Sequence, residues 1–208
     1  MITRTLCHWV WLAAIVLPAA LWAADTPGPR EIDARKSVMT VRVFKSGLLS
    51  AFGHEHEISA PIQQGTLSET DHSVELVVDA RQMRVMDKDV SEKERAEIQE
   101  TMLGPRVLDP GRFPEIRFHS TVVEAAGEGR WTVQGNLTLH GLTRPVKVDV
   151  QGQGGHYQGS AELKQKDFGI EPVTGGGGAV KTKNELRVEF EIVAKRNDGA
   201  TGVPDRPR

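Results

Sequence analysis

The sequence predicts a mainly β protein, a closed antiparallel eight-stranded β-barrel with one inserted α-helix. Three observations lead to this prediction. Most of the chain alternates apolar and polar residues with a period of two, which is typical of strands that bury one face. One segment combines helix-capping signals with good helix formers. Strands with one apolar face each can bury that face, and lose their exposed edges, by closing into a barrel.

Residues 1–23 have the features of a secretory signal peptide, which is removed before the mature protein folds. Arg4 supplies positive charge, an apolar run extends from Trp9 to Ala20, and Ala23 offers a small residue for cleavage. The alternatives are an uncleaved membrane anchor and a buried N-terminal helix. An anchor needs roughly 20 apolar residues, and this run is shorter, so we expect a periplasmic or secreted protein without a stable membrane span.

Composition excludes several classes of function for the mature chain. Cys7 is the only cysteine and leaves with the signal peptide, which removes disulfides, thiolate metal sites and cysteine nucleophiles together. In the whole sequence the 28 acidic and 26 basic residues give a formal net charge of −2, and they form no long single-sign blocks. Neither nucleic acid nor an anionic membrane surface is therefore an expected partner.

About eight strands are expected in chain order. Six are marked by alternating apolar rows: Met39 to Val43, Val74 to Val78, Ile116 with Phe118 and Val122, Trp131 to Leu139, Val146 to Val150, and Leu186 to Ile192. Two further stretches, Phe52 to Thr70 and Tyr157 to Asp167, are expected to form longer, bent strands.

The helix is expected from Ser91 to Leu103. Ser91 and Glu94 form a capping box, and Gly104-Pro105 ends the helical pattern. Ile98, Met102 and Leu103 cluster on a narrow stripe, and the polar face is not strongly basic. We therefore expect this helix to pack across one end of the barrel rather than to insert into a membrane.

The organisation predicted is one domain at residues 37–195. An extension covers residues 24–36, and residues 196–208, with several glycines and prolines, form a disordered tail. No repeat of 20–50 residues suggests a second domain.

An eight-stranded barrel is either filled by side chains or holds one small ligand. Aromatic residues make up only 5% of the chain, and the inward rows are mostly Val and Leu, which favours a cavity. Strand parity places six candidate ligand-binding side chains in its lumen: Phe52, Phe118, Leu137, Leu139, Val188 and Phe190.

Three blocks carry a resemblance to a known family. Residues 112–121 (RFPEIRFHST), 133–146 (VQGNLTLHGLTRPV) and 167–170 (DFGI) are similar to the blocks of the YceI-like family, in the same order, and the resemblance covers roughly residues 37–195. It implies a lipocalin-like barrel, secreted by bacteria, whose members hold a polyisoprenoid, and it implies neither an enzyme nor a cofactor. Phe168 in the third block joins the candidate ligand-binding residues.

The stretch Gly53-His54-Glu55-His56 departs from that family pattern. If the strand is extended, His54 and His56 share the inward face with Phe52 and Ile58, and the intervening glutamates point to solvent. The histidines could hydrogen-bond the head group of a ligand or an ordered water. They could also ligate a metal, but an open zinc site needs three protein ligands and a closed one four, so we expect no metal.

Other possible chemical motifs have simpler interpretations. No Gly-x-Ser-x-Gly elbow is present. Asp87 and Asp89 precede the helix cap, and we expect them to serve the helix N-terminus or solvent. Gly175 to Gly178 lacks the Lys-Ser/Thr of a phosphate loop and is expected to be a mobile hairpin.

Local backbone signals complete the pattern. Gly135 suggests a bulge or a close approach within a strand. Gly141 and Pro145 are expected to bracket a turn.

Three functions remain open at this point. The leading one is a carrier that holds a lipid or isoprenoid chain in the lumen. The alternative is a metal-dependent or histidine-dependent enzyme that uses His54 and His56. A barrel with a filled interior that serves as an interaction partner is the third.

Export gives the first testable prediction. Protein recovered from the periplasm should begin near Ala24 when its N-terminus is sequenced, because the apolar run is followed by a small residue and a polar start at Asp25-Thr26-Pro27. Finding only the full-length chain, in the cytoplasm, would contradict it.

Overall fold

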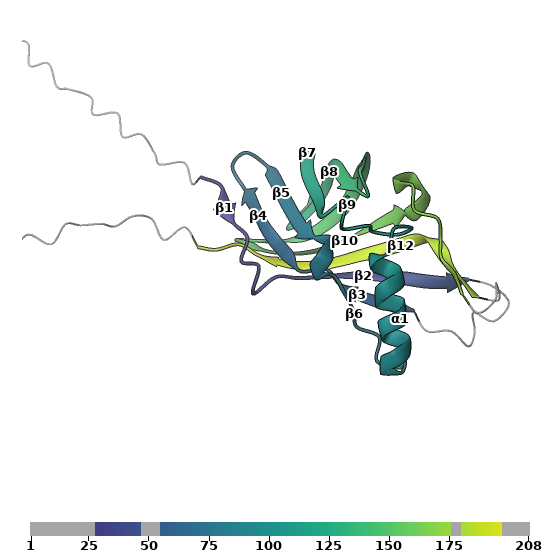
Figure 1. The fold of residues 1–208 in the computed structure, drawn as a ribbon. Coiled ribbons are helices and arrows are strands. Elements are labelled where there is room, and N and C mark those ends of the chain that lie inside the picture. The colour runs from purple at the N-terminus through teal and green to yellow at the C-terminus, as the bar shows by residue number, and fades with distance from the viewer. Residues whose placement is uncertain (1–27, 47–54, 176–179, 197–208) are drawn as a thin grey trace, which may run out of the picture.

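The computed structural model describes residues 28–46, 55–175 and 180–196. The expected signal peptide, the expected tail from residue 197 onward, Phe52 and His54 lie outside the described residues. Within them the chain forms one antiparallel sheet of twelve strands, one α-helix and short 3-10 helices (Figure 1). The mainly β architecture with one inserted helix is therefore confirmed.

Most of the expected strands are present with similar limits. In chain order the strands are β1 (Arg30–Glu31), β2 (Val38–Ser46), β3 (His56–Ser59), β4 (Ile62–Ser68), β5 (Ser73–Asp79), β6 (Arg84–Val85), β7 (Glu115–Gly127), β8 (Arg130–Leu139), β9 (Leu142–Gln153), β10 (His156–Lys164), β11 (Thr174–Gly175) and β12 (Val180–Val193). The helices are η2 (Ala80–Gln82), α1 (Glu92–Leu103) and η3 (Gln165–Phe168).

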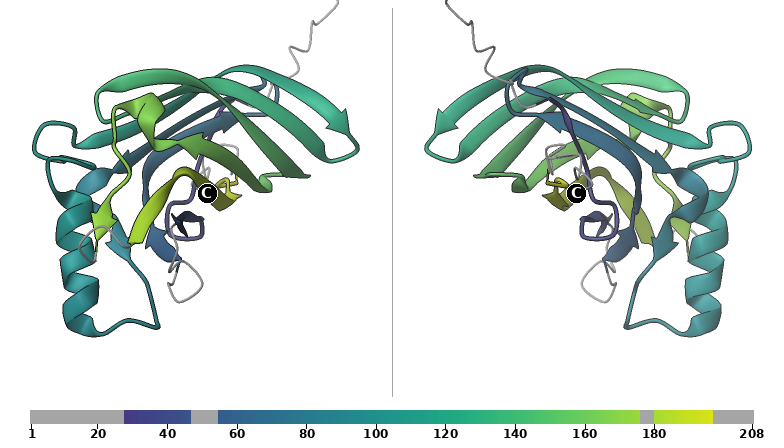
Figure 2. Two further views of the ribbon diagram at one scale, coloured as in Figure 1. Left: turned by 90° about the vertical axis from the view of Figure 1, so that its right-hand side faces the viewer. Right: turned by 90° about the vertical axis from the view of Figure 1, so that its left-hand side faces the viewer.

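The sheet curls into a half-barrel, and the closed eight-stranded barrel is not confirmed (Figure 2). Across the described residues the strand order is β1-β4-β5-β7-β8-β9-β10-β12-β2-β3-β6, with β11 beside β12. The short strands β1 and β6 end this order, so the hydrogen-bonded ladder is not continuous around the curl.

The break lies in a segment expected to be one bent strand, Phe52 to Thr70. Ala60-Pro61 interrupts it, and proline has no N–H to donate to a ladder. The residues before the break form β3, which pairs with β2, and those after it form β4, which pairs with β5. The two halves therefore lie towards opposite margins of the sheet, and a covalent bend joins those margins in place of a row of hydrogen bonds.

Residues 30–33 tie the curl together at one end. The N–H of Ile32 donates to the carbonyl of Gly65 in β4 (2.9 Å), and the N–H of Asp33 donates to the carbonyl of Val193 in β12 (2.7 Å). Ile32 also bridges Ala194 and is only 4% exposed. The folded unit therefore includes residues that the sequence analysis placed in an extension ahead of the domain.

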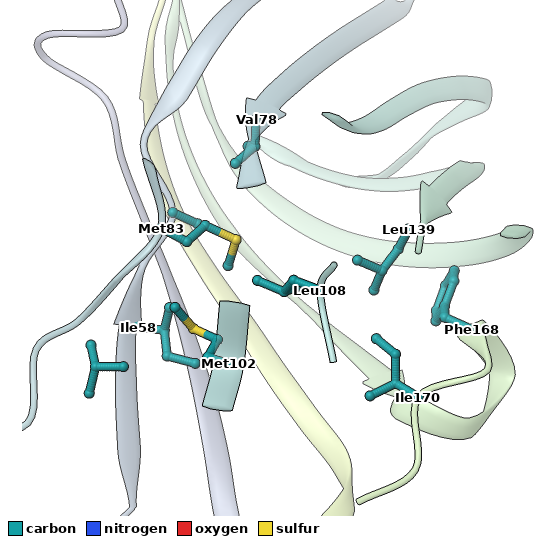
Figure 3. Close-up of a cluster of buried hydrophobic side chains, with 10 residues drawn as sticks. Ile58, Val78, Met83, Met102, Leu108, Leu139, Phe168 and Ile170 are labelled. Carbon is teal, nitrogen blue, oxygen red and sulfur yellow. The ribbon is translucent and has the colours of Figure 1, made fainter. Parts of the chain in front are cut away.

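The helix α1 matches its expected limits. The Oγ of Ser91 accepts from the N–H of Glu94 at 3.2 Å, and Gly104 follows the last turn. Met102 is buried and joins Leu108, Phe168 and Ile170 in an apolar cluster at one end of the curl (Figure 3). This is the packing predicted from the helix stripe. No helix among the described residues is long and apolar enough to span a membrane.

One expected inward residue faces the other way. Val122 is 42% exposed, whereas Val123 lines the interior. The reason is a register shift in the β7–β8 pairing between Ser120 and Val122, at which an extra residue enters one strand. A bulge of this kind reverses the inward and outward parity beyond it.

The β8–β9 turn also differs from the prediction. His140 and Gly141 both have positive φ, at 49° and 75°, as a two-residue hairpin turn requires, and Leu139 pairs with Leu142. Gly141 thus lies in the turn, but Pro145 does not bracket it. Pro145 lies within β9, opposite Asn136.

Gly135 is required by close packing. A Cβ at this position would lie 2.5 Å from two ring carbons of Phe118 and 2.6 Å from the carbonyl oxygen of His119. The ring of Phe118 therefore occupies the space that a side chain at Gly135 would need.

We expect Gly135→Ala to lower the free energy of unfolding by about 1–3 kcal/mol, since the Phe118 ring must shift away from a low-energy position. Chemical denaturation would measure this change. Gly111→Ala is the matched control, because its Cβ would approach nothing nearer than 3.9 Å, and it should change stability by less than about 0.5 kcal/mol. Equal effects of the two substitutions would contradict the packing argument.

Candidate functional site

The concave face of the sheet encloses a cavity of about 440 Å³ with an almost entirely apolar lining. Its wall consists of the alternating inward side chains of the long strands, among them Val41 from β2, Leu76 from β5, Val148 from β9 and Leu163 from β10. This volume lies within the range of about 300–1,000 Å³ that is typical of small-molecule sites.

Seven of the ten candidate ligand-binding residues line this cavity: Ile58, Phe118, Leu137, Leu139, Phe168, Val188 and Phe190. His56 is described but is not among the lining residues. Phe52 and His54 lie outside the described residues. The period-two pattern thus placed the inward side chains of β8 and β12, and those of β7 before its bulge, correctly on the concave face.

Sequence reasoning missed lining residues that come from outside the regular strands. Met83 follows η2, Leu108 lies in the loop after α1, and Ile170 follows η3, yet all three are buried and line the cavity. No periodicity marks them, because their positions depend on tertiary packing rather than on strand alternation.

One end of the cavity is sealed within the described part of the chain. Met102 of α1, Leu108 and Phe168 are 6%, 7% and 2% exposed and cover it together. Gln165 also borders this end, and its side-chain amide donates to the carbonyl of Lys183 at 2.7 Å. This end therefore offers mainly hydrocarbon to a ligand.

The opposite end is polar and open to solvent. It is formed by the β4–β5 and β9–β10 turns, and we call it the polar mouth, defined by the lining residues Glu69, His72, Ser73, Gln153 and Tyr157. The hydroxyl of Tyr157 donates to Oε1 of Glu69 at 2.8 Å. Burial, reinforced by this bond to a carboxylate, raises the pKa of Tyr157 to about 12, so the phenol stays neutral at physiological pH.

His56 has a different partner from the one expected. It lies opposite Val43 in the β2–β3 pairing, on the concave side, but its Nδ1–H donates to Oδ2 of Asp87 over 2.6 Å. Oδ1 of Asp87 accepts from the N–H of Glu57 at 2.7 Å, and the Asp87 side chain is only 2% exposed. Asp87 therefore serves β3 rather than the helix N-terminus or solvent.

Arg95 of α1 completes this link by donating from Nε to the carbonyl of Asp87 at 3.0 Å. A carboxylate that fixes one imidazole nitrogen leaves the other as an acceptor, which is an arrangement used by metal sites and general bases. Across residues 28–46, 55–175 and 180–196, however, no three His, Cys, Asp or Glu side chains gather in a way that could hold a metal ion.

Two further histidines of the described residues, His119 and His140, have local structural contacts. His119 is exposed and bonds Glu75 at 3.1 Å. His140 bonds the carbonyl of Phe168 through Nδ1 at 3.3 Å and packs edge-on against Phe113. These contacts join the β8–β9 turn to η3 and to the segment before β7.

A comparison with family models gives a match to the YceI-like domain over residues 31–194. The chain belongs to the YceI-like family. This match begins within β1 and ends one residue after β12, so it covers the whole curled sheet.

Two relatives of this chain carry the name UPF0312 protein. One from Pseudomonas savastanoi is 37% identical over 99 residues, which is 43% of this chain and half the length of that relative. One from Vibrio parahaemolyticus is 29% identical over 188 residues, covering 85% of this chain and 92% of that protein. The first match thus spans only about half of the Pseudomonas protein.

Solved structures of low identity share the fold. The crystal structure of BcnA from Burkholderia cenocepacia has a TM-score of 0.54 and 20% identity, covering 79% of this chain and 99% of that one. A mutant of the Campylobacter jejuni YCEI protein has a TM-score of 0.50 and 11% identity, covering 67% of this chain and 81% of that one.

The buried Asp87 should matter for stability. Asp87→Ala removes the acceptor for both the Glu57 N–H and the His56 ring, so we expect the free energy of unfolding to fall by about 2–4 kcal/mol in chemical denaturation. Asp149→Ala is the control, since that side chain is 76% exposed and its contact with Lys147 is 3.9 Å. The control should change stability by less than about 0.5 kcal/mol. An equally small loss of stability in Asp87→Ala would contradict the structural role of Asp87.

Proposed function

We propose that this protein binds and carries a lipid-like molecule, such as a polyisoprenoid, outside the cytoplasm. The observation that supports it most directly is the apolar cavity of about 440 Å³ under the curled sheet. Membership of a family with a lipocalin-like fold is consistent with this role. The expected signal peptide would deliver the protein to the periplasm or the medium.

The physical basis of binding is the transfer of hydrocarbon from water into this lining. Each buried methylene contributes about 0.8 kcal/mol, so a five-carbon isoprene unit contributes up to about 4 kcal/mol before the cost of ordering the chain is subtracted. A few units are then sufficient for stable binding. The sealed apolar end suits the tail of such a molecule, and the polar mouth suits its head.

The described geometry favours binding over catalysis. The Val, Leu, Ile and Phe side chains that form most of the wall offer neither a nucleophile nor an acid–base pair to a molecule lying along them. The His56–Asp87 pair lies outside the cavity lining. An enzyme that uses a metal or a catalytic histidine there would need further groups besides this pair.

Solvent extraction and mass spectrometry of the purified protein would test the function. We expect a stoichiometric lipid in the parent and a collapse of lipid content in Leu139→Arg, because Leu139 is 9% exposed and a charge there cannot be solvated. Val188→Trp fills the cavity without adding a charge and should lower lipid content while the protein stays folded.

Asn136→Arg is the matched control, since Asn136 lies on the exposed face of the same strand as Leu139. It should keep the lipid content and thermal stability of the parent. Bound metal without lipid in the parent would overturn the proposal in favour of the enzyme, and full lipid content in Leu139→Arg would show that this side chain does not face the ligand.

A further inference from the structure

We propose that the polar mouth selects the head group of the ligand: it accepts an uncharged head that donates a hydrogen bond, such as an alcohol, and rejects the phosphate ester of the same chain. This inference rests on the proposed function and names the chemistry of its ligand. Two observations support it. The two ends of the cavity differ in polarity, and the charged groups at the mouth, Glu69 and the adjacent Arg30, already bind other groups of the protein.

The position of the head group follows from the ends of the cavity. Met102, Leu108 and Phe168 close the far end with buried apolar side chains. Lys164 borders that end too, but it follows the inward Leu163 along β10 and is exposed, so strand parity points its ammonium group outward. A ligand with an apolar chain therefore places its tail at the far end and its head at the mouth.

The charged group of the mouth is a carboxylate. Glu69 lines the cavity, and its side chain is 47% exposed. The neutral Tyr157 donates its hydroxyl to Oε1 of Glu69, which fixes the carboxylate at the opening. An incoming hydroxyl or N–H finds an acceptor there, whereas a phosphate meets a charge of the same sign, and such juxtapositions cost up to several kcal/mol.

Arg30 offsets part of that charge, but its guanidinium is already engaged and is not available to a phosphate. Arg30 lies 3.4 Å from Oε1 of Glu69 through Nη1, but its other guanidinium nitrogens are used elsewhere. Nε donates to the carbonyl of Lys195 at 2.8 Å, and Nη2 donates to that of Ala194 at 3.2 Å. Arg30 is also absent from the cavity lining, so it supports the mouth from outside the cavity. It has no free pair of N–H groups with which to bind a phosphate.

The surface just inside the mouth is aromatic. The rings of His72 and Trp131 are 6.1 Å apart, and both residues line the cavity. The indole N–H of Trp131 is used by the carbonyl of Gly152 at 3.3 Å. An uncharged head can pack on this surface, and the His72 imidazole can exchange a hydrogen bond with a hydroxyl.

The test compares head groups on one chain. Delipidated full-length protein would be loaded with a fluorescent lipid probe, which is then displaced by geranylgeraniol or by geranylgeranyl phosphate. We expect the alcohol to bind at least about tenfold more tightly than the phosphate. The repulsion between the phosphate and Glu69 is weaker than that between buried like charges, because the mouth is exposed to solvent. Added salt should narrow the difference, since the repulsion is screened.

The variant Glu69→Gln keeps an acceptor for Tyr157 and removes the charge. We expect it to improve binding of the phosphate, leaving a difference of less than about threefold between the two ligands. Glu162→Gln is the matched control on the exposed face of β10, and it should leave the difference unchanged.

Three outcomes would overturn the inference. The phosphate could bind as tightly as the alcohol, or Glu69→Gln could leave the difference intact. Lys164→Gln could weaken the phosphate alone, which would place the head at the far end. Failure of both ligands to displace the probe would instead contradict the proposed function, so the two proposals fail in different ways.

Discussion

A single sheet with one apolar face has to cover that face without a second sheet, and the rest of this structure depends on that requirement. Apolar area removed from water contributes about 25 cal/mol per Å², so the concave row of Val, Leu and Phe side chains drives the curl. The ends of the curl then need covers. At one end α1 and the segment around Phe168 supply apolar side chains, while at the other residues 30–33 tie β4 to β12. The inward side chains line the interior but leave a cavity between them.

The period-two alternation of the sequence predicted most of the strands and many of the side chains that line the cavity. Along β8, Trp131, Val133, Leu137 and Leu139 all face the cavity, as alternation requires. Helix α1 could be predicted because its signals are local: a serine cap at one end and a glycine at the other. Features that lie within one strand or one helix were accessible from the residues alone.

The features that could not be predicted involve residues that are far apart in the sequence, or a change in the inward and outward alternation along a strand. Because of the bulge near Ser120, Val123 rather than Val122 faces the cavity, and nothing in the residue types marks this bulge. The Ala60-Pro61 break was visible, but its effect was not, since pairing partners decide to which margin each half goes. The partners His56 and Asp87 are 31 positions apart and meet only through the β3–β6 pairing, which no local pattern indicates.

The bulge in β7 has a consequence for how this chain can change in length during evolution. In a single-layered sheet every position belongs either to the solvent face or to the cavity face, and insertion of one residue exchanges the two sets from there to the next turn. The extra residue in β7 is absorbed because β8 continues in step on both sides of it. Within a regular stretch of the long strands, an insertion would instead turn a row of valines outward and a row of charges inward. We therefore expect length variation among relatives to collect in the turns, while the strands diverge by substitution, with each face free to change without the other.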